Sequence, residues 1–210
     1  MILYIKNIFH KIKLFIKVYF LPYRKLNQGK EIWEKQFDSG HWNYLGDIKQ
    51  LARYSILVGF VDYFFSENCN ILDLGCGNGV LLKRLKNIKF SSYTGVDLAS
   101  KAIEEAARIV DERSNFICES IEDFQPNKKY DIIIFNESLY YLDDPIKTLF
   151  KFNNYLSSNG KIIISMWDSK ERNNKLWKLI EKEFNVIDEI HLQKTKTKSA
   201  WIIKIISTKL

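Results

Sequence analysis

A glycine-rich stretch near the first third of the chain has the pattern of a ligand-binding turn. Gly75, Gly77 and Gly79 alternate with other residues directly after an apolar run over residues 70–74, and a helical pattern follows over residues 80–87. Glycine has no Cβ to hold a ligand away, and the first N–H groups of a helix lack backbone partners. A strand, a glycine turn and a helix start therefore predict a site where a ligand lies against bare backbone.

Two acidic residues indicate which ligand this turn prefers. Asp73 stands just before the glycines, where a carboxylate repels a pyrophosphate but suits a cation or an amine. Val80 occupies the position at which a dinucleotide fingerprint requires its third glycine. Asp97 ends a second predicted strand, over residues 92–97, and a βαβ unit would bring its two oxygens to the hydroxyls of a ribose beside the turn. The pattern favours a positively charged nucleoside over a nicotinamide dinucleotide.

The pattern from Asp73 to Gly79 resembles motif I of the class I S-adenosylmethionine-dependent methyltransferases. The resemblance covers about residues 33–210 and implies S-adenosylmethionine as the cofactor. It also implies an α/β fold with a Rossmann-like, doubly wound, seven-stranded sheet whose last strand is antiparallel. The runs that we predict as strands are residues 70–74, 92–97, 115–118, 130–135, 161–166, 184–192 and 199–207.

The resemblance implies a role for residues along much of the chain. The glycine loop would lie against the methionine part and ribose of the cofactor, Arg53 would pair with its carboxylate, and Trp42 or Tyr44 would cover the sulfonium. The loop after the third strand would meet the adenine, although Ser120 stands where the family often has an acid. The expected cofactor-binding residues are Tyr44, Arg53, Asp73, Gly75, Cys76, Gly77, Asn78, Asp97, Leu98, Ser120, Ile121 and Asn136.

Candidate catalytic residues depend on the acceptor, because a hydroxyl gains from a base whereas a neutral amine needs none. His41 is the first choice as a base, since the unperturbed pKa of histidine lies close to neutrality. Glu137 is a second candidate, with bracing of its loop as the alternative role. Tyr141 stands where many family members have histidine, so we expect it to orient the acceptor rather than take its proton. His191 and Asp168 are further candidates for the base.

The net charge of +7 is concentrated at the N-terminus. Residues 1–30 contain no acidic residue and carry the basic residues Lys6, Lys11, Lys13, Lys17, Arg24, Lys25 and Lys30. Over residues 1–21 a helical period separates an aromatic and isoleucine-rich face from the lysines. Two interpretations stay open: a helix packed on the protein or a second copy, and an interfacial helix on an anionic membrane. The large apolar face argues against nucleic acid as a partner.

Composition sets the remaining expectations. With 210 residues, 46% hydrophobic and 27% charged, the chain is expected to form one globular domain over residues 31–210, capped by residues 31–66, with residues 1–30 as an appendage. Cys69, Cys76 and Cys118 show no metal-ligand spacing and no disulfide framework. We therefore expect no metal and a cytoplasmic location, with peripheral contact at the inner membrane face if the first helix binds lipid.

Three functions are compatible with these patterns. The favoured one is methyl transfer from S-adenosylmethionine to an oxygen or nitrogen of a small-molecule or sugar acceptor. A nicotinamide-dependent oxidoreductase and a non-catalytic interaction protein with the same fold are the alternatives.

Overall fold

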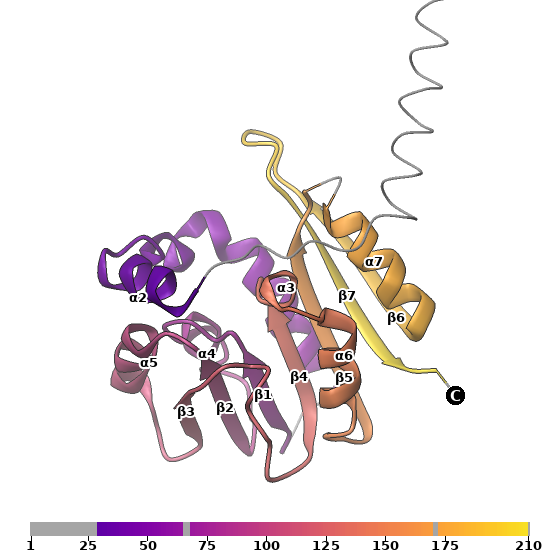
Figure 1. Ribbon diagram of the computed structural model, residues 1–210, viewed down its shortest axis with the longest axis horizontal. Helices are drawn as coiled ribbons and strands as arrows, with labels where there is room; N and C mark the ends of the chain where they lie inside the picture. Colours follow the sequence, from indigo (N-terminus) through magenta and orange to yellow (C-terminus); the bar gives the residue numbers. More distant parts are fainter. Residues whose placement is uncertain (1–28, 65–67, 170–171, 210) are drawn as a thin grey trace, which may run out of the picture.

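The computed structural model describes residues 29–64, 68–169 and 172–209, which form a three-layered α/β fold (Figure 1). Seven strands make one sheet in the order β3-β2-β1-β4-β5-β7-β6. The strands from β3 to β5 pair in parallel, and β7 runs antiparallel to both β5 and β6. The predicted fold class, a doubly wound sheet with an antiparallel last strand, is confirmed.

The strands are β1 (Asn70–Leu74), β2 (Ser92–Asp97), β3 (Ser114–Cys118), β4 (Tyr130–Asn136), β5 (Leu156–Trp167), β6 (Phe184–Gln193) and β7 (Ala200–Thr208). The α-helices are α2 (Lys30–Asp38), α3 (Ile48–Phe64), α4 (Val80–Arg84), α5 (Ser100–Ala106), α6 (Pro145–Asn153) and α7 (Arg172–Glu183). The short 3-10 helices are η1 (Asn43–Gly46), η2 (Ala107–Ile109) and η3 (Leu139–Tyr141).

The sheet is apolar on both faces because helices cover both of them. On one face, Leu57 of α3 and Leu81 of α4 pack in the same cluster as Ile132 of β4. On the other face, Leu149 of α6 and Trp177 of α7 pack in a cluster that includes other β4 side chains. Strand β4 lies between β1 and β5, and its side chains from Ile132 to Phe135 are fully buried.

The topology explains where a site can form. The strand order reverses between β1 and β4, and ligands of open α/β sheets bind at the carboxyl ends of the strands beside such a reversal. Because β7 is antiparallel, the turn from β6 to β7 stands at this same edge, where Trp167 of β5 lies opposite Trp201 of β7. Figure 1 shows the tip of this hairpin at the same end of the molecule as α2.

Two local sequence signals do not match the structure. Asn159 and Gly160, which predict the end of a helix, lie inside β5, and α6 ends earlier, at Asn153. Ser100, which predicts an N-cap, is already the first residue of α5. The N-cap residue is Ala99, and the carboxylate of Glu34 from α2 accepts the N–H groups of Ser100 and Lys101 instead, at 2.8 and 3.1 Å.

The predicted amphipathic helix over residues 1–21 lies outside the described residues. Within the described ranges, no helix has both the length and the apolar character needed to cross a bilayer.

Candidate active site

A cavity of about 560 Å³ opens at the carboxyl-terminal edge of the sheet. Its wall is built by α2, η1 and the first half of α3, by the turns after β1, β2, β3 and β4, and by the ends of β5 and β7 with their neighbouring hairpin. Segments from both halves of the chain therefore meet around one space, at the reversal of strand order.

The glycine turn after β1 is held in place by β2. The N–H groups of Gly75 and Cys76 donate to the Val96 carbonyl, at 2.8 and 3.1 Å. Asp97 accepts the N–H of Gly77 at 2.9 Å through one oxygen and that of Ala99 at 3.0 Å through the other. Burial raises the pKa of the Asp97 carboxyl, while these N–H groups counteract the rise. The turn and Asp97 thus form one rigid cradle on the cavity wall.

Positions 75 and 77 require glycine for different reasons. Gly75 has φ +82°, and a Cβ placed on it would lie 2.4 Å from the Cβ of Ser138. Gly77 has φ +53°, but a Cβ there would meet only the Phe37 ring at an ordinary 3.5 Å. Packing inside the protein therefore excludes a side chain at Gly75, whereas at Gly77 the backbone conformation alone disfavours one.

Asp73, which is among the expected cofactor-binding residues, does not line the cavity, whereas Asp97 does. Strand alternation turns its side chain to the same sheet face as Ile71, away from the opening. The carboxyl is 1% exposed and accepts the hydroxyl of Tyr93 at 2.5 Å, and its other oxygen has no hydrogen-bond partner among the described residues. Burial raises its pKa to about 7.

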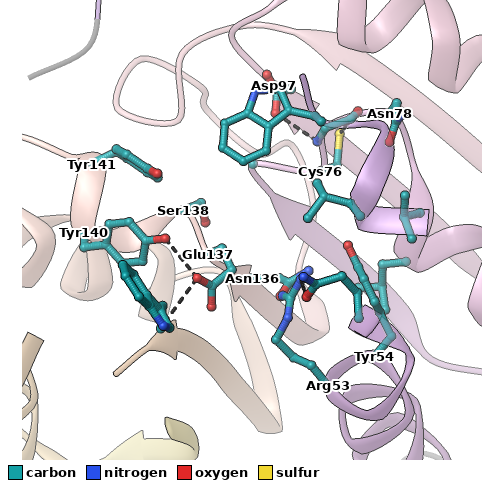
Figure 2. Close-up of a pocket in the computed structure, with 18 of the residues that line it drawn as sticks. Arg53, Tyr54, Cys76, Asn78, Asp97, Asn136, Glu137, Ser138, Tyr140 and Tyr141 are labelled. Carbon is teal, nitrogen blue, oxygen red and sulfur yellow. Dashed lines mark hydrogen bonds between the residues drawn. The ribbon is translucent and has the colours of Figure 1, made fainter. Parts of the chain in front are cut away.

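Arg53 reaches the cavity from α3 as a buried cation (Figure 2). Its side chain is 2% exposed, one guanidinium nitrogen donates to the Asn136 side-chain oxygen, and its carbon lies 4.7 Å from the centre of the Tyr54 ring. Among the described residues, no carboxylate lies within 4.0 Å of the guanidinium, and its Nε has no hydrogen-bond partner. A buried cation without an anionic partner suits a negatively charged ligand group.

Glu137 ties the end of β4 to β5 and η3. Its carboxylate accepts the Tyr140 hydroxyl at 2.9 Å, the Trp167 N–H at 3.1 Å and the Ser165 hydroxyl at 3.3 Å. Figure 2 shows the carboxylate pointing toward Tyr140. The residue has φ +63°, a conformation that costs energy for a side chain with a Cβ and that these bonds maintain. Burial raises the pKa of the carboxyl.

An aromatic wall closes the cavity on the side of α2. The Trp33 ring meets the Tyr141 ring edge to face at 4.7 Å between centroids and stacks on Trp42 at 5.7 Å. Trp33 and Phe37 line the cavity, although their spacing in the sequence indicates only the packing face of a helix. Trp42 lines it too, and the buried Nε1 of its indole has no hydrogen-bond partner among the described residues.

Most of the predicted site residues share this cavity. Those on its wall are Tyr44, Arg53, Gly75, Cys76, Gly77, Asn78, Asp97, Leu98, Ser120, Ile121, Asn136, Glu137 and Tyr141. The Ser120 hydroxyl, predicted to face the adenine, accepts the N–H groups of Glu122 and Asp123 at 3.2 and 3.3 Å. Sequence reasoning missed Gln50, Trp201 and Lys194, which also line the cavity.

His41 lies outside the cavity, contrary to its choice as a base. Its exposed ring touches Trp42 and Tyr44 at their edges, on the outer side of the turn before η1. His191 is exposed on β6, where it bonds to Glu189, and Asp168 also lies off the wall. No group of three or more potential metal ligands occurs in the described ranges.

A family model described as a methyltransferase domain matches residues 9–197. The chain belongs to this methyltransferase family. The sequence resemblance to the class I S-adenosylmethionine-dependent methyltransferases is thereby confirmed.

Individual relatives are more distant. A malonyl-[acyl-carrier protein] O-methyltransferase of Priestia megaterium is 28% identical over 140 residues, which are 65% of this chain and 51% of the relative. The chain thus spans about half the length of the curated relatives it matches. The N-methyltransferase NodS of Bradyrhizobium japonicum, solved with S-adenosyl-L-homocysteine, superimposes with a TM-score of 0.71 at 14% identity, over 84% of this chain and 98% of NodS. At this identity the likeness establishes the shared fold.

Proposed function

We propose that this chain transfers a methyl group from S-adenosylmethionine to an oxygen or nitrogen atom of a small-molecule or sugar acceptor. The observation that carries the proposal is the glycine turn held by Asp97 on the wall of the cavity, in a chain of a methyltransferase family. The volume of about 560 Å³ lies in the range of sites for small ligands.

The residues on the wall suit the parts of this cofactor. The turn from Gly75 to Asn78 would receive the nucleoside and methionine backbone, and Asp97 the ribose hydroxyls. Leu98 and Ile121 offer apolar contact for the adenine, and Arg53 offers a guanidinium for the carboxylate. The side-chain oxygen of Asn78 is buried without a hydrogen-bond partner among the described residues, which is consistent with a polar group arriving from a ligand.

When bound, S-adenosylmethionine supplies a methyl group that is already electrophilic. The chain therefore needs mainly to align an acceptor and to exclude water. Tyr44 and Tyr141 would orient the acceptor beside the sulfonium position, and Trp33 and Trp42 would close the cavity. Glu137 would act as a positioning residue, since its carboxylate already accepts three hydrogen bonds that hold the loop after β4.

The two alternative functions have less support. Val80 still occupies the place of the third glycine of a dinucleotide site, and no finding favours a nicotinamide. A non-catalytic role would not account for the cavity or for the buried Arg53 on its wall. Release of S-adenosylhomocysteine from S-adenosylmethionine in the presence of cell extract would exclude that role.

Calorimetry tests the proposal. The chain should bind S-adenosylhomocysteine with measurable heat and NADH with none. Asp97→Asn should weaken S-adenosylhomocysteine binding about tenfold to a hundredfold, because hydrogen bonds to a charged group contribute about 1.5–3 kcal/mol. Asp111→Asn is the control, since Asp111 is an exposed carboxylate that pairs with Arg113 and does not line the cavity. Absence of heat with S-adenosylhomocysteine would overturn the proposal.

The proposal extends to the organisation of the chain. Residues 31–210 would form the catalytic domain, with residues 31–66 as its cap, and residues 1–30 would be an appendage that contacts an anionic membrane peripherally. The support is the basic and amphipathic pattern of residues 1–21.

A further inference from the structure

The cavity divides into two halves along the sheet. One half lies over β1, β2 and β3 and contains the glycine turn and Asp97. The other half lies over β4, β5 and β7 and contains Glu137, Trp167 and Trp201. If the first half holds the cofactor, as the proposed function requires, the second half is where the acceptor lies.

No free base faces this second half within the described residues. Both imidazoles of the described ranges, His41 and His191, lie off the wall. Of the carboxylates on the wall, Asp97 accepts two backbone N–H groups and Glu137 accepts three hydrogen bonds. Glu122, on the turn after β3, accepts the Asp143 N–H at 2.9 Å and belongs to the other half.

Tyr44 and Tyr140, which also line the cavity, are poor candidates for a base. Burial raises the pKa of Tyr44, and the nearby charge of Glu137 raises it further. Burial, with the same charge, raises the pKa of Tyr140 well above its usual value. Both side chains therefore stay protonated near neutral pH, and their hydroxyls are hydrogen-bond donors.

Cations gather at this end of the cavity. Lys194, from the turn between β6 and β7, places its ammonium 5.6 Å from the centre of the Trp201 ring. The Arg53 guanidinium, which the proposed function assigns to the carboxylate of the cofactor, lies 5.9 Å from the centre of the same ring. Lys49 lines the cavity one helical turn before Arg53, on the same face of α3. The lysine-rich sequence of this hairpin indicates a turn exposed to solvent, but Lys194 lines the cavity.

We infer that the acceptor is a small molecule with a carboxylate, and that a carboxylate oxygen receives the methyl group. The inference deepens the proposed function and rests on it. If the protein provides no base to deprotonate the acceptor, the acceptor must bind in a form that is already nucleophilic, either as a neutral amine or as an anion. Lys49 and Lys194 repel a protonated amine and attract an anion, and the protonated hydroxyl of Tyr44 can donate to an oxyanion.

The step balances without a proton transfer. A lone pair of the carboxylate oxygen forms the new C–O bond, the C–S bond breaks, and its electron pair stays on sulfur. The negative acceptor and the positive sulfonium become a neutral ester and a neutral thioether. The chain supplies orientation and charge complementarity, and no residue has to accept a proton.

Two naphthylamine probes that differ by one anionic group test the charge of the acceptor half. Fluorescence titrations measure the affinity of both probes for the full chain saturated with S-adenosylhomocysteine. The sulfonate, 8-anilinonaphthalene-1-sulfonate, should bind more tightly than uncharged N-phenyl-1-naphthylamine. Lys194→Gln should weaken the sulfonate about threefold to fivefold, as expected for one partly exposed ion pair, and leave the neutral probe unchanged. Lys198→Gln is the matched control from the same turn, because Lys198 is exposed and off the wall.

The chemistry of the product is the second measurement. The chain is incubated with methyl-labelled S-adenosylmethionine and cell extract, and the product is treated with mild alkali. A methyl ester releases its label as volatile methanol, whereas an ether or an N-methyl product does not. Release supports the inference, and an alkali-stable product overturns it. If no product forms, the fluorescence titrations test the inference. Equal affinity for the two probes, or an unchanged affinity of Lys194→Gln for the sulfonate, would overturn it. Binding of S-adenosylhomocysteine would still support the proposed function in that case.

Discussion

Asp73 and Asp97 end neighbouring strands, but their side chains meet different surroundings. Asp97 satisfies both oxygens with backbone N–H groups at the cavity wall. Asp73 is buried beneath the turn with the Tyr93 hydroxyl as its only hydrogen-bond partner among the described residues. A buried carboxyl with one donor favours its neutral form, which is why the pKa of Asp73 is raised to about 7.

Asp73→Asn is therefore expected to make unfolding less sensitive to pH. The folded state binds a proton at Asp73 up to about pH 7, while the unfolded carboxyl loses it near pH 3.8. The stability from this group is fully present below the unfolded pKa and is lost as pH rises through the folded pKa. Asparagine does not titrate, so the variant does not lose this stability. As pH rises between those two values, the free energy of unfolding of the variant should increase relative to that of the parent by about 1.4 kcal/mol per pH unit.

Urea unfolding at several pH values measures this difference. Asparagine keeps the size of the side chain and an acceptor for Tyr93, so the comparison isolates the charge. The gain should reach about 4 kcal/mol and level off above neutral pH. A difference that does not change with pH would show that Asp73 is ionised in both states.

At the scale of elements, one carboxylate links α2 to α5. Glu34 of α2 accepts the first N–H groups of α5, so an acidic side chain from another helix takes the place of a local N-cap. Burial alone would raise the Glu34 pKa, but these two N–H groups hold it below its usual value. The contact fixes α2, and with it Trp33 and Phe37, over the Asp97 turn.

Glu34→Gln should loosen the cap more than it destabilises the fold. Because charge at a helix N-terminus contributes about 0.3–1 kcal/mol, affinity for S-adenosylhomocysteine should fall about twofold to fivefold. Hydrogen exchange of α2 should accelerate, while the urea midpoint changes little. Glu31→Gln is the control from the same helix, since Glu31 is exposed. Equal effects of the two substitutions would mean that Glu34 does not hold the cap.

The glycine turn gives a second comparison at this scale. Gly75→Ala should lower the free energy of unfolding by about 2–4 kcal/mol, from the left-handed backbone and from the clash with Ser138. Gly77→Ala carries only the backbone cost, about 1–2 kcal/mol. Urea unfolding of both variants measures the difference. If Gly77→Ala were the more damaging, the packing explanation for Gly75 would fail.

The sequence predicts β1, β4 and the second half of β5 well because these strands are nearly continuous apolar runs. The sequence also indicates the glycines of the turn and Asp97, because a ligand that lies close to the backbone requires these residue types. It does not predict which face Asp73 takes beneath the turn, or that His41 points outward. Those outcomes depend on tertiary packing, as does the contribution of Lys194, which reaches the cavity only because β7 is antiparallel.

At the scale of the whole molecule, one cavity joins segments from Trp33 to Trp201. Helix α2, at the start of the described chain, and the β6–β7 hairpin near its end both stand at the carboxyl-terminal edge of the sheet (Figure 1). Under the proposed function an acceptor would enter between these two segments, so a surface that binds this side of the molecule would also orient the entrance.

Residues 1–21 precede the cap and carry the charge that such a surface would attract. Their removal is expected to abolish pelleting with vesicles that contain anionic phosphatidylserine, because each juxtamembrane lysine contributes about 1 kcal/mol near such a surface. The calorimetric affinity for S-adenosylhomocysteine should stay the same, since the cavity lies within the described residues. Vesicles of neutral phosphatidylcholine are the control and should pellet neither protein. If the shortened chain still pelleted with anionic vesicles, the membrane would not be the partner of this segment, and packing on the protein or on a second copy would remain as its role.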